Sequence, residues 1–223
     1  MHKGHTRGID ILVTSILLAI VYNSWLLGFI LNNPVVHHDL SSQLEVAGQP
    51  YNWLFVSADV MTGLLSIILV CLLWANRTKK HLTSAMNVIV IGLIMFGLFT
   101  AISALLPLSC QTSDTRCGAH LSQTFGIHDV TGGIASFGLF ISLAGAWLYS
   151  GKVKPNLSHL VVCCTTILWC VAGIAYLVFT VVNKYTVGIQ QIFLILSGVA
   201  IIVIGISTQG LLSTRKTATP HND

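Results

Sequence analysis

Six long apolar segments constrain the fold of this chain more than any other feature of its sequence. Each has about 20 residues or more, the length of helix that crosses the roughly 30 Å hydrocarbon core of a bilayer. The segments are continuous and do not alternate between polar and apolar residues, which favours helices over the strands of a membrane barrel. We expect transmembrane helices near residues 9–31, 53–74, 82–106, 125–149, 160–182 and 187–212.

The charged residues are few and are gathered between the apolar segments. Only 8% of the 223 residues are charged, against about 25% in soluble domains. The connecting stretches, including the longest at 32–52 and 107–124, are too short to build a core of their own. The sequence therefore predicts one all-α transmembrane domain over residues 1–223. The net charge of +4 does not indicate nucleic-acid binding, because the basic residues occur in short clusters that act as topology signals.

The first apolar segment follows Lys3 and Arg7 and in that respect resembles a signal peptide. It is longer than the apolar part of a signal peptide, and no cleavage site of small residues follows it. We expect it to be retained as the first helix of the bundle.

The basic residues predict the orientation in the membrane. Two of them, Arg116 and Lys184, fall in loops on one side. The other nine fall on the opposite side: Lys3, Arg7, Arg77, Lys79, Lys80, Lys152, Lys154, Arg215 and Lys216. Since cytoplasmic segments carry the excess of Lys and Arg, we expect both termini to be cytoplasmic and the protein to lie in the plasma membrane.

The acidic residues are distributed in the opposite way. Asp10 and Asp223 are expected inside, and the others outside: Asp39, Glu45, Asp59, Asp114 and Asp129. Asp59 and Asp129 are unusual because they lie within apolar segments. A carboxylate that faces lipid at such a depth costs several kcal/mol, so an acid inside a membrane segment indicates a functional site.

The cysteines agree with this topology. Cys110 and Cys117 both lie in the second outer loop, where an oxidising compartment favours a disulfide between them. The other four lie within apolar segments and are expected to be free, small packing residues: Cys71, Cys163, Cys164 and Cys170.

Helices 2 and 4 share the pattern D-V-x-x-G-x-x-S, over residues 59–66 and 129–136. Residues at these spacings lie on one face of a helix. Glycine allows two helices to approach closely, and serine can hydrogen-bond across the contact. We interpret Gly63, Ser66, Gly133 and Ser136 mainly as a packing seam, in what could be a repeated helical hairpin.

Several polar residues are expected at one depth near the outer surface. His128 precedes Asp129, and both are expected to face a pocket shared with Asp59. The pocket that binds a ligand is predicted to include Asn23, Ser57, Asp59, Ser66, His128, Asp129 and Gln190. Its catalytic candidates, if it is an enzyme, are Asp59, His128 and Asp129.

This set of residues is compatible with more than one chemistry. His37, His38 and His128 could bind a metal such as zinc and activate water, or a serine could act as a nucleophile, Ser57 being the nearest candidate. Their spacing matches no diagnostic motif such as H-E-x-x-H or G-x-S-x-G. A coupled carrier is disfavoured because the last two helices carry no charge.

The chain resembles a bacterial six-helix membrane family of unknown function, similar in layout to the DRAM and Sfk-type proteins. The residues that carry the resemblance are Leu40–Ser42, Tyr51–Phe55, Pro107–Cys110, Cys117 and His128–Asp129. The resemblance implies a plasma-membrane location and an outward-facing site. A looser similarity is to seven-helix zinc hydrolases, from which this chain differs by having six helices and no H-x-x-x-H pair on a late helix.

The leading hypothesis is therefore a membrane protein whose outward-facing polar pocket, between helices 2 and 4, binds a lipid or an amphipathic small molecule. The alternatives are a metal-dependent hydrolase of lipid esters or amides at the outer leaflet, and a structural or partner-binding protein. Membrane lipid is the one partner that the sequence indicates.

Overall fold

The computed structural model describes residues 3–31, 33, 35–75, 83–106, 121–152, 157–182 and 186–213. Within these ranges all regular structure is helical. Among the described residues, five long helices are apolar enough to cross a membrane, and the number is six if the bent pair of helices near the start of the chain is counted as one span. The elements are α1 (Lys3–Tyr22), η1 (Ser24–Leu26), α2 (Leu27–Ile30), α3 (Val35–His38), η2 (Ser41–Glu45), α4 (Asn52–Ala75), α5 (Thr83–Leu105), α6 (Leu121–Gly151), α7 (Leu157–Val181) and α8 (Thr186–Ser213).

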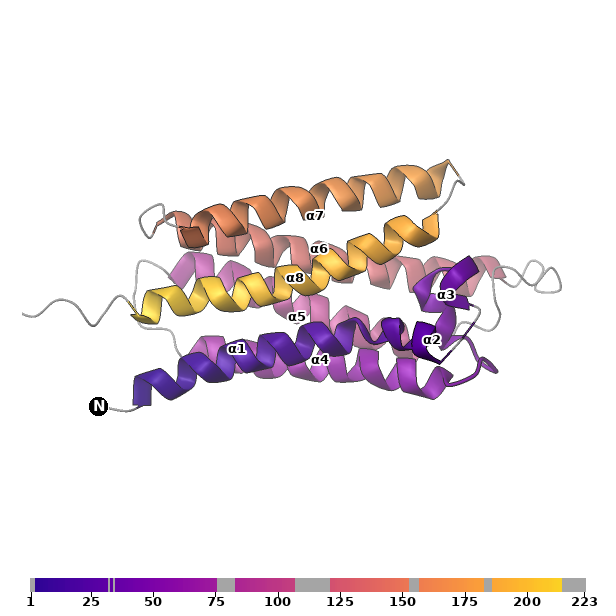
Figure 1. Ribbon diagram of the computed structural model, residues 1–223, viewed down its shortest axis with the longest axis horizontal. Coiled ribbons are helices and arrows are strands. Elements are labelled where there is room, and N and C mark those ends of the chain that lie inside the picture. Colours follow the sequence, from indigo (N-terminus) through magenta and orange to yellow (C-terminus); the bar gives the residue numbers. More distant parts are fainter. Residues whose placement is uncertain are drawn as a thin grey trace, which may run out of the picture.

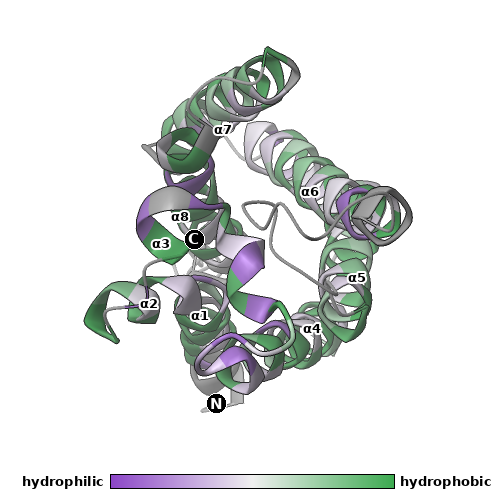
Figure 2. Ribbon diagram, turned by 90° about the vertical axis from the view of Figure 1, so that its right-hand side faces the viewer, coloured by the Kyte–Doolittle hydropathy of each residue, from purple (hydrophilic) through white to green (hydrophobic). Residues whose placement is uncertain are grey.

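The long helices form an elongated bundle in which α1, α4, α5, α6, α7 and α8 follow one another around a ring (Figures 1 and 2). α5 packs most extensively against α6 and α4, whereas α7 packs mainly on α8. The described start of α1 and end of α8 lie at the same end of the bundle, and α2 and α3 lie at the other (Figure 1). We call the latter the α3 end.

Glycines set the close packing of α4, α5 and α6. A Cβ atom on Gly138 would lie 2.6 Å from the Phe96 backbone nitrogen, and one on Gly63 would lie 2.8 Å from the Gly97 carbonyl oxygen. Ser66 Oγ donates a hydrogen bond to the Leu93 carbonyl across the α4–α5 contact, at 2.7 Å. Such contacts exclude larger side chains, since small residues are what allow membrane helices to approach closely.

The repeated D-V-x-x-G-x-x-S pattern predicts packing correctly in α4 but not in α6. Gly63 and Ser66 of α4 are buried against α5, as expected. Gly133 of α6 is exposed, and a Cβ atom there would have no neighbour within 4 Å. The expected seam through Gly133 is therefore wrong, because α6 meets α5 through a different face that includes Gly138.

The predicted continuous first helix over residues 9–31 is also wrong. α1 ends at Tyr22, and the chain bends by 47° before it continues through η1 and α2. Asn23 lies at the break, where its Nδ2 donates to the Ala19 carbonyl and its Oδ1 accepts a hydrogen bond from Trp25 Nε1. These side-chain bonds add to the backbone hydrogen bonds that Asn23 makes with Ala19 and Leu26, and they stabilise the bend.

The segment that was expected to be an outer loop is a compact element. We call α2, α3 and η2 together the cap. Five buried side chains form a small apolar core beneath it: Trp25, Val35, Val36, Leu44 and Phe55. Two glutamines of α8 hold the cap in place, because Gln190 Oε1 accepts a hydrogen bond from the Ser41 backbone N–H and Gln191 Nε2 donates one to the Val36 carbonyl, both at 2.8 Å.

Candidate functional site

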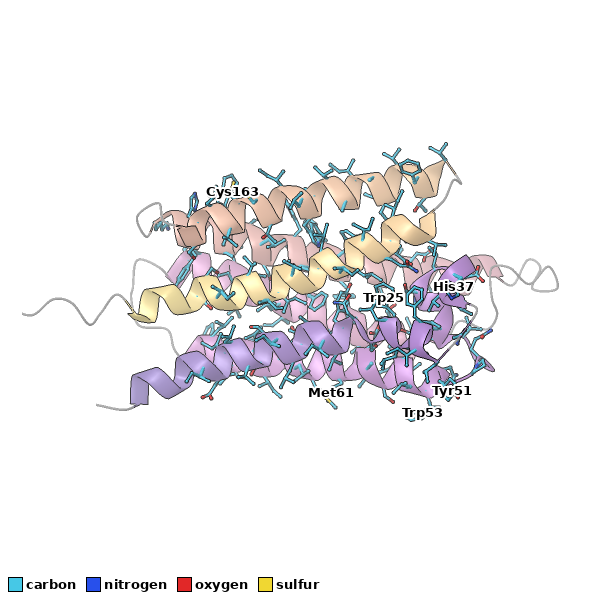
Figure 3. All side chains as sticks on the ribbon, in the orientation of Figure 1. Trp25, His37, Tyr51, Trp53, Met61 and Cys163 are labelled. Carbon is cyan, nitrogen blue, oxygen red and sulfur yellow. The ribbon has the colours of Figure 1, made fainter. Side chains whose placement is uncertain are left out.

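Asp59 lies on the inner face of α4. Phe55, Thr62 and Ser66 are buried residues of the same stripe, three or four residues apart along the helix. The side chain of Asp59 is half-buried, whereas Trp53 and Met61 on the other face are exposed (Figure 3). The carboxyl group therefore faces protein rather than lipid, as expected for an acid within a membrane segment.

The carboxyl group of Asp59 meets a second carboxyl group, that of Glu45 from η2. The two side chains are hydrogen-bonded to each other. Burial raises the pKa of Glu45 well above its ordinary value of 4.5, and the negative charge of Asp59 and the hydrogen bond raise it further. Two carboxyl groups share a hydrogen bond only when one of them carries a proton, and the raised pKa of Glu45 indicates that Glu45 holds it and donates to Asp59.

Tyr22, the last residue of α1, links these acids to two other helices. Its phenol interacts electrostatically with Asp59 and with Tyr176 of α7, and it is hydrogen-bonded to Ser197 of α8. We call Tyr22, Glu45, Asp59, Tyr176 and Ser197 the Tyr22 cluster. The cluster thus draws one polar side chain from each of α1, η2, α4, α7 and α8.

The hydroxyl group of Ser197 makes two further hydrogen bonds. It donates to the Phe193 carbonyl and accepts from Trp169 Nε1, each at 2.9 Å. Since its one proton is already donated, Ser197 can only accept from Tyr22. The Tyr22 phenol therefore acts as the donor in that bond.

Aromatic rings surround the cluster. Tyr22 meets Phe96 edge to face at 5.1 Å between ring centroids. Tyr176 stacks on Phe193 at 6.0 Å, and Phe193 meets Trp169 at 4.9 Å. The polar groups are thus framed by ring faces and edges contributed by α1, α5, α7 and α8.

No basic side chain balances the acids within the part of the chain that is described. Among the side chains that are described, Lys152 is the one Lys or Arg, and it follows the end of α6, which lies opposite the α3 end (Figure 1). The charge that remains on the hydrogen-bonded pair of carboxyl groups is therefore not neutralised by a described cation of the protein.

Thr62 follows Asp59 by three residues, about one helical turn, and lies on the same face of α4. Its side chain is fully buried, with 0% of its surface exposed. Its Oγ1 has no hydrogen-bond partner among the described residues. A buried hydroxyl without a partner costs about 1–3 kcal/mol, so this position has hydrogen-bonding capacity that the described residues leave unused.

His128 and Asp129 lie on α6, which α5 separates from α4 in the ring (Figure 2). His128 is buried, and its Nδ1 is hydrogen-bonded to Ser103 Oγ of α5 at 3.1 Å. Asp129 is exposed and interacts electrostatically with His128 and with Tyr176. Asp129 is thus linked to Asp59 only indirectly, by electrostatic interactions that run through Tyr176 and Tyr22.

The remaining predicted ligand-binding residues have other roles in the structure. Asn23 stabilises the bend after α1, and Gln190 holds the cap and also donates to the Tyr176 hydroxyl at 3.5 Å. The Ser66 hydroxyl is engaged with α5. Ser57 is exposed on the outer face of α4, on the same stripe as Trp53 and Met61 and away from Asp59 (Figure 3).

The predicted metal ligands are not brought together in the part of the structure that is described. His37 lies in the cap, where its ring meets Phe29 at 5.2 Å between centroids (Figure 3), and His128 is bonded to Ser103. The side chain of His38 lies outside the described residues. The described side chains contain no group of three His, Cys, Asp or Glu residues that could hold a metal ion.

The predicted disulfide between Cys110 and Cys117 also lies outside the described residues. The four cysteines of the helices are free, as expected. Cys163 and Cys170 are half-buried, but Cys71 and Cys164 are exposed rather than packed in the core.

Four residues of the Tyr22 cluster were not among the predicted site residues. Glu45 was counted only as an outer acid, and Tyr22, Tyr176 and Ser197 were part of apolar segments. The one local signal is the run Tyr22–Asn23–Ser24, three consecutive residues with polar groups in an otherwise apolar helix. The pairing of Glu45 with Asp59 depends on how the cap folds back onto α4.

Comparison with known proteins identifies the family of the chain but no characterised relative. No curated protein and no solved structure matches it significantly. The sequence profile of a family described as "Protein of unknown function (DUF998)" matches residues 13–207, which include the second half of α1, all of α4, α5, α6 and α7, and most of α8. The chain therefore belongs to the DUF998 family.

Proposed function

We propose that this protein binds a lipid or an amphipathic small molecule at the Tyr22 cluster. The observation that carries the proposal is the Asp59 carboxyl group, which faces Glu45 and Tyr22 inside an apolar bundle where no described basic residue balances it. Intramembrane acids are costly and are retained mainly where they act on a ligand, an ion or a proton.

The surroundings of Asp59 suit an amphipathic ligand. The Tyr22 cluster supplies polar contacts at one level of the bundle, and the neighbouring rings of Phe96, Phe193 and Trp169 supply apolar contacts. Binding sites for small molecules generally combine an apolar lining with a few placed polar groups.

The distribution of basic residues supports a plasma-membrane location with both termini in the cytoplasm. In that orientation the cap and the Tyr22 cluster are on the outer side, and the ligand belongs to the outer leaflet or to the outer medium. The similarity in layout to the DRAM and Sfk-type proteins is a further part of this proposal and agrees with a role in contact with lipid.

Mass spectrometry of the intact protein with its native lipids tests the proposal. The wild-type protein should retain a defined non-covalent ligand that Asp59→Asn releases. Asp10→Asn is the matched control, because Asp10 is an exposed acid near the other end of α1. Random lipid adducts that are identical in all three proteins would contradict the proposal.

A second candidate function is hydrolysis of a lipid ester or amide, and the Ser103–His128 hydrogen bond favours it. In this reaction the Ser103 hydroxyl would attack the carbonyl carbon while His128 accepts its proton. The ester or amide bond would then break as His128 returns the proton to the leaving alcohol or amine, and water would release the acid from Ser103. A fluorophosphonate probe would label Ser103 of the wild-type protein and fail to label Ser103→Ala or His128→Ala. Absence of labelling in the wild-type protein would remove this candidate.

A further inference from the structure

The charge of the Tyr22 cluster restricts the ligands that it can bind. Glu45 and Asp59 are hydrogen-bonded, and the proton between them leaves one negative charge on the pair. The charged and titratable groups that face this pair are Tyr22 of α1 and, through Tyr22, Tyr176 of α7. Both are neutral phenols at physiological pH, so the negative charge is not balanced within the cluster.

We propose that the ligand of the Tyr22 cluster carries an ammonium head group, which contacts the Asp59 carboxylate between the rings of Tyr22 and neighbouring aromatic residues. This inference rests on the proposed function and names the chemical class of its ligand. An anionic head group would be repelled by the pair, whereas a neutral one would leave a buried charge without a partner.

The aromatic residues of the site favour the same class. Cations are attracted to the faces of tyrosine, phenylalanine and tryptophan rings within about 6 Å, and this attraction is strongest where water is excluded. The Tyr22 side chain interacts electrostatically with Asp59, and the ring of its partner Phe96 lies at 5.1 Å from the Tyr22 ring between centroids. Tyr176 and Phe193 continue the aromatic frame toward α7 and α8.

Thr62 provides an independent indication of a hydrogen-bonding ligand. Its Oγ1 is fully buried one turn below Asp59 and has no partner among the described residues. A primary ammonium has three N–H donors, and the Thr62 oxygen and the Asp59 carboxylate are both acceptors on the same face of α4. A head group with N–H donors is therefore preferred over a quaternary one.

Glu45 supports this arrangement by remaining neutral. As a protonated acid it donates to Asp59 and leaves the second carboxylate oxygen of Asp59 for the ligand. Asp59→Asn keeps the shape of the side chain but removes the charge that attracts an ammonium ligand.

Two probes with the same chain and opposite charge test the inference, namely dodecylammonium and dodecanoate. The purified protein in dodecyl maltoside micelles is titrated with each, and bound molecules are counted by native mass spectrometry. The wild-type protein should bind one dodecylammonium saturably and bind dodecanoate at least about thirtyfold more weakly, since loss of a buried charge contact costs about 2 kcal/mol or more. Dodecyltrimethylammonium, which lacks N–H donors, should bind more weakly than dodecylammonium.

The variants and the two probes together distinguish a failure of this inference from a failure of the proposed function. Asp59→Asn should weaken dodecylammonium binding by about thirtyfold or more, and Asp10→Asn, which changes an exposed acid outside the cluster, should leave it unchanged. Equal or tighter binding of dodecanoate by the wild-type protein would overturn the inference while leaving an amphiphile-binding function in place. If Asp59→Asn does not fold, the comparison of the two probes on the wild-type protein decides. Absence of saturable binding for both probes would instead contradict the proposed function.

Discussion

The side chains of Glu45 and Asp59 are hydrogen-bonded to each other and thereby join the cap to the inner face of α4. This contact crosses the boundary between an element outside the membrane-spanning helices and one of those helices. The attachment of the cap to α4 therefore depends on the proton of Glu45, because loss of this proton would place two negative charges in contact.

The stability of the protein is expected to fall as pH rises because of Glu45. Burial raises the pKa of Glu45 above its ordinary value of 4.5, so the native state binds this proton more tightly than the unfolded state does. The stabilisation is complete below that ordinary value and is lost as pH rises through the raised one. Thermal unfolding of the wild-type protein and of Glu45→Gln, measured between about pH 5 and about pH 8, should show a decline only in the wild type. Parallel curves for the two proteins would exclude this role of Glu45.

Gly138 and Gly133 of α6 should respond in opposite ways to alanine. A Cβ atom on Gly138 would lie 2.6 Å from the Phe96 nitrogen and 2.7 Å from the Gly92 oxygen, and these backbone atoms cannot move away easily. Gly138→Ala should cost about 1–3 kcal/mol and lower the melting temperature in detergent. Gly133→Ala meets no neighbour within 4 Å and should be neutral or slightly stabilising, since alanine favours a helix. A similar loss in both variants would argue against the described α5–α6 contact.

Asn23 should be coupled energetically to Trp25. Asn23→Ala removes the acceptor of the Trp25 indole N–H, which belongs to a buried side chain, and should cost about 1–3 kcal/mol. In the background of Trp25→Phe, which has no indole N–H, the same substitution should cost less. A double-mutant cycle on thermal stability measures the difference. Additive effects would show that the hydrogen bond does not contribute.

Gln191 should control local opening of the cap. Gln191→Ala removes the hydrogen bond to the Val36 carbonyl, worth about 1 kcal/mol, and should speed amide exchange in α3 and η2 by about fivefold. Thr166→Ala is a suitable control, because the Thr166 hydroxyl donates to the Val162 carbonyl within α7, away from the cap. Exchange measured by mass spectrometry should leave the long helices unchanged in both variants.

The orientation of the bundle can be tested with two single cysteines. Ala47 is exposed between η2 and α4, and Lys152 is exposed after α6. In a background without the native cysteines, Ala47→Cys should react with a membrane-impermeant maleimide on intact cells. Lys152→Cys should react only after the membrane is opened. The reverse pattern would overturn the expectation of cytoplasmic termini that follows from the basic residues.

The apolar segments were sufficient to predict an all-helical chain with five long apolar helices, because the length of a membrane helix depends on local composition. They could not predict the bend after Tyr22, since it depends on hydrogen bonds that Asn23 makes with Ala19 and Trp25. Asn23 was recognised as an unusual polar residue, but it was interpreted as a ligand contact rather than as the cause of a break.

The candidate site was predicted only in part for a similar reason. Asp59 was identified because a carboxylate within an apolar segment is costly in any fold. Its partners Glu45 and Tyr22 are distant in sequence, and only the folding of the cap and the end of α1 brings them to it. For His128 and Asp129, the sequence predicted the position along the helix. It did not specify which way each side chain points around the helix axis, and His128 points toward Ser103 of α5.

The bend after Tyr22 also has a consequence for the thickness of membrane that the protein matches. The apolar part of α1, from Ile9 to Tyr22, extends for about 21 Å at 1.5 Å per residue, short of the roughly 30 Å of hydrocarbon in an average bilayer. Beyond the bend the chain continues at 47° to α1, so α2 adds less depth than a straight helix would, although its side chains include Ile30 at 75% exposure. We therefore expect hydrophobic mismatch at this side of the bundle, with lipid that thins locally around α1. Glu45 and α2 belong to the same cap. A change in bilayer thickness that moves α2 would therefore pull on the contact between Glu45 and Asp59.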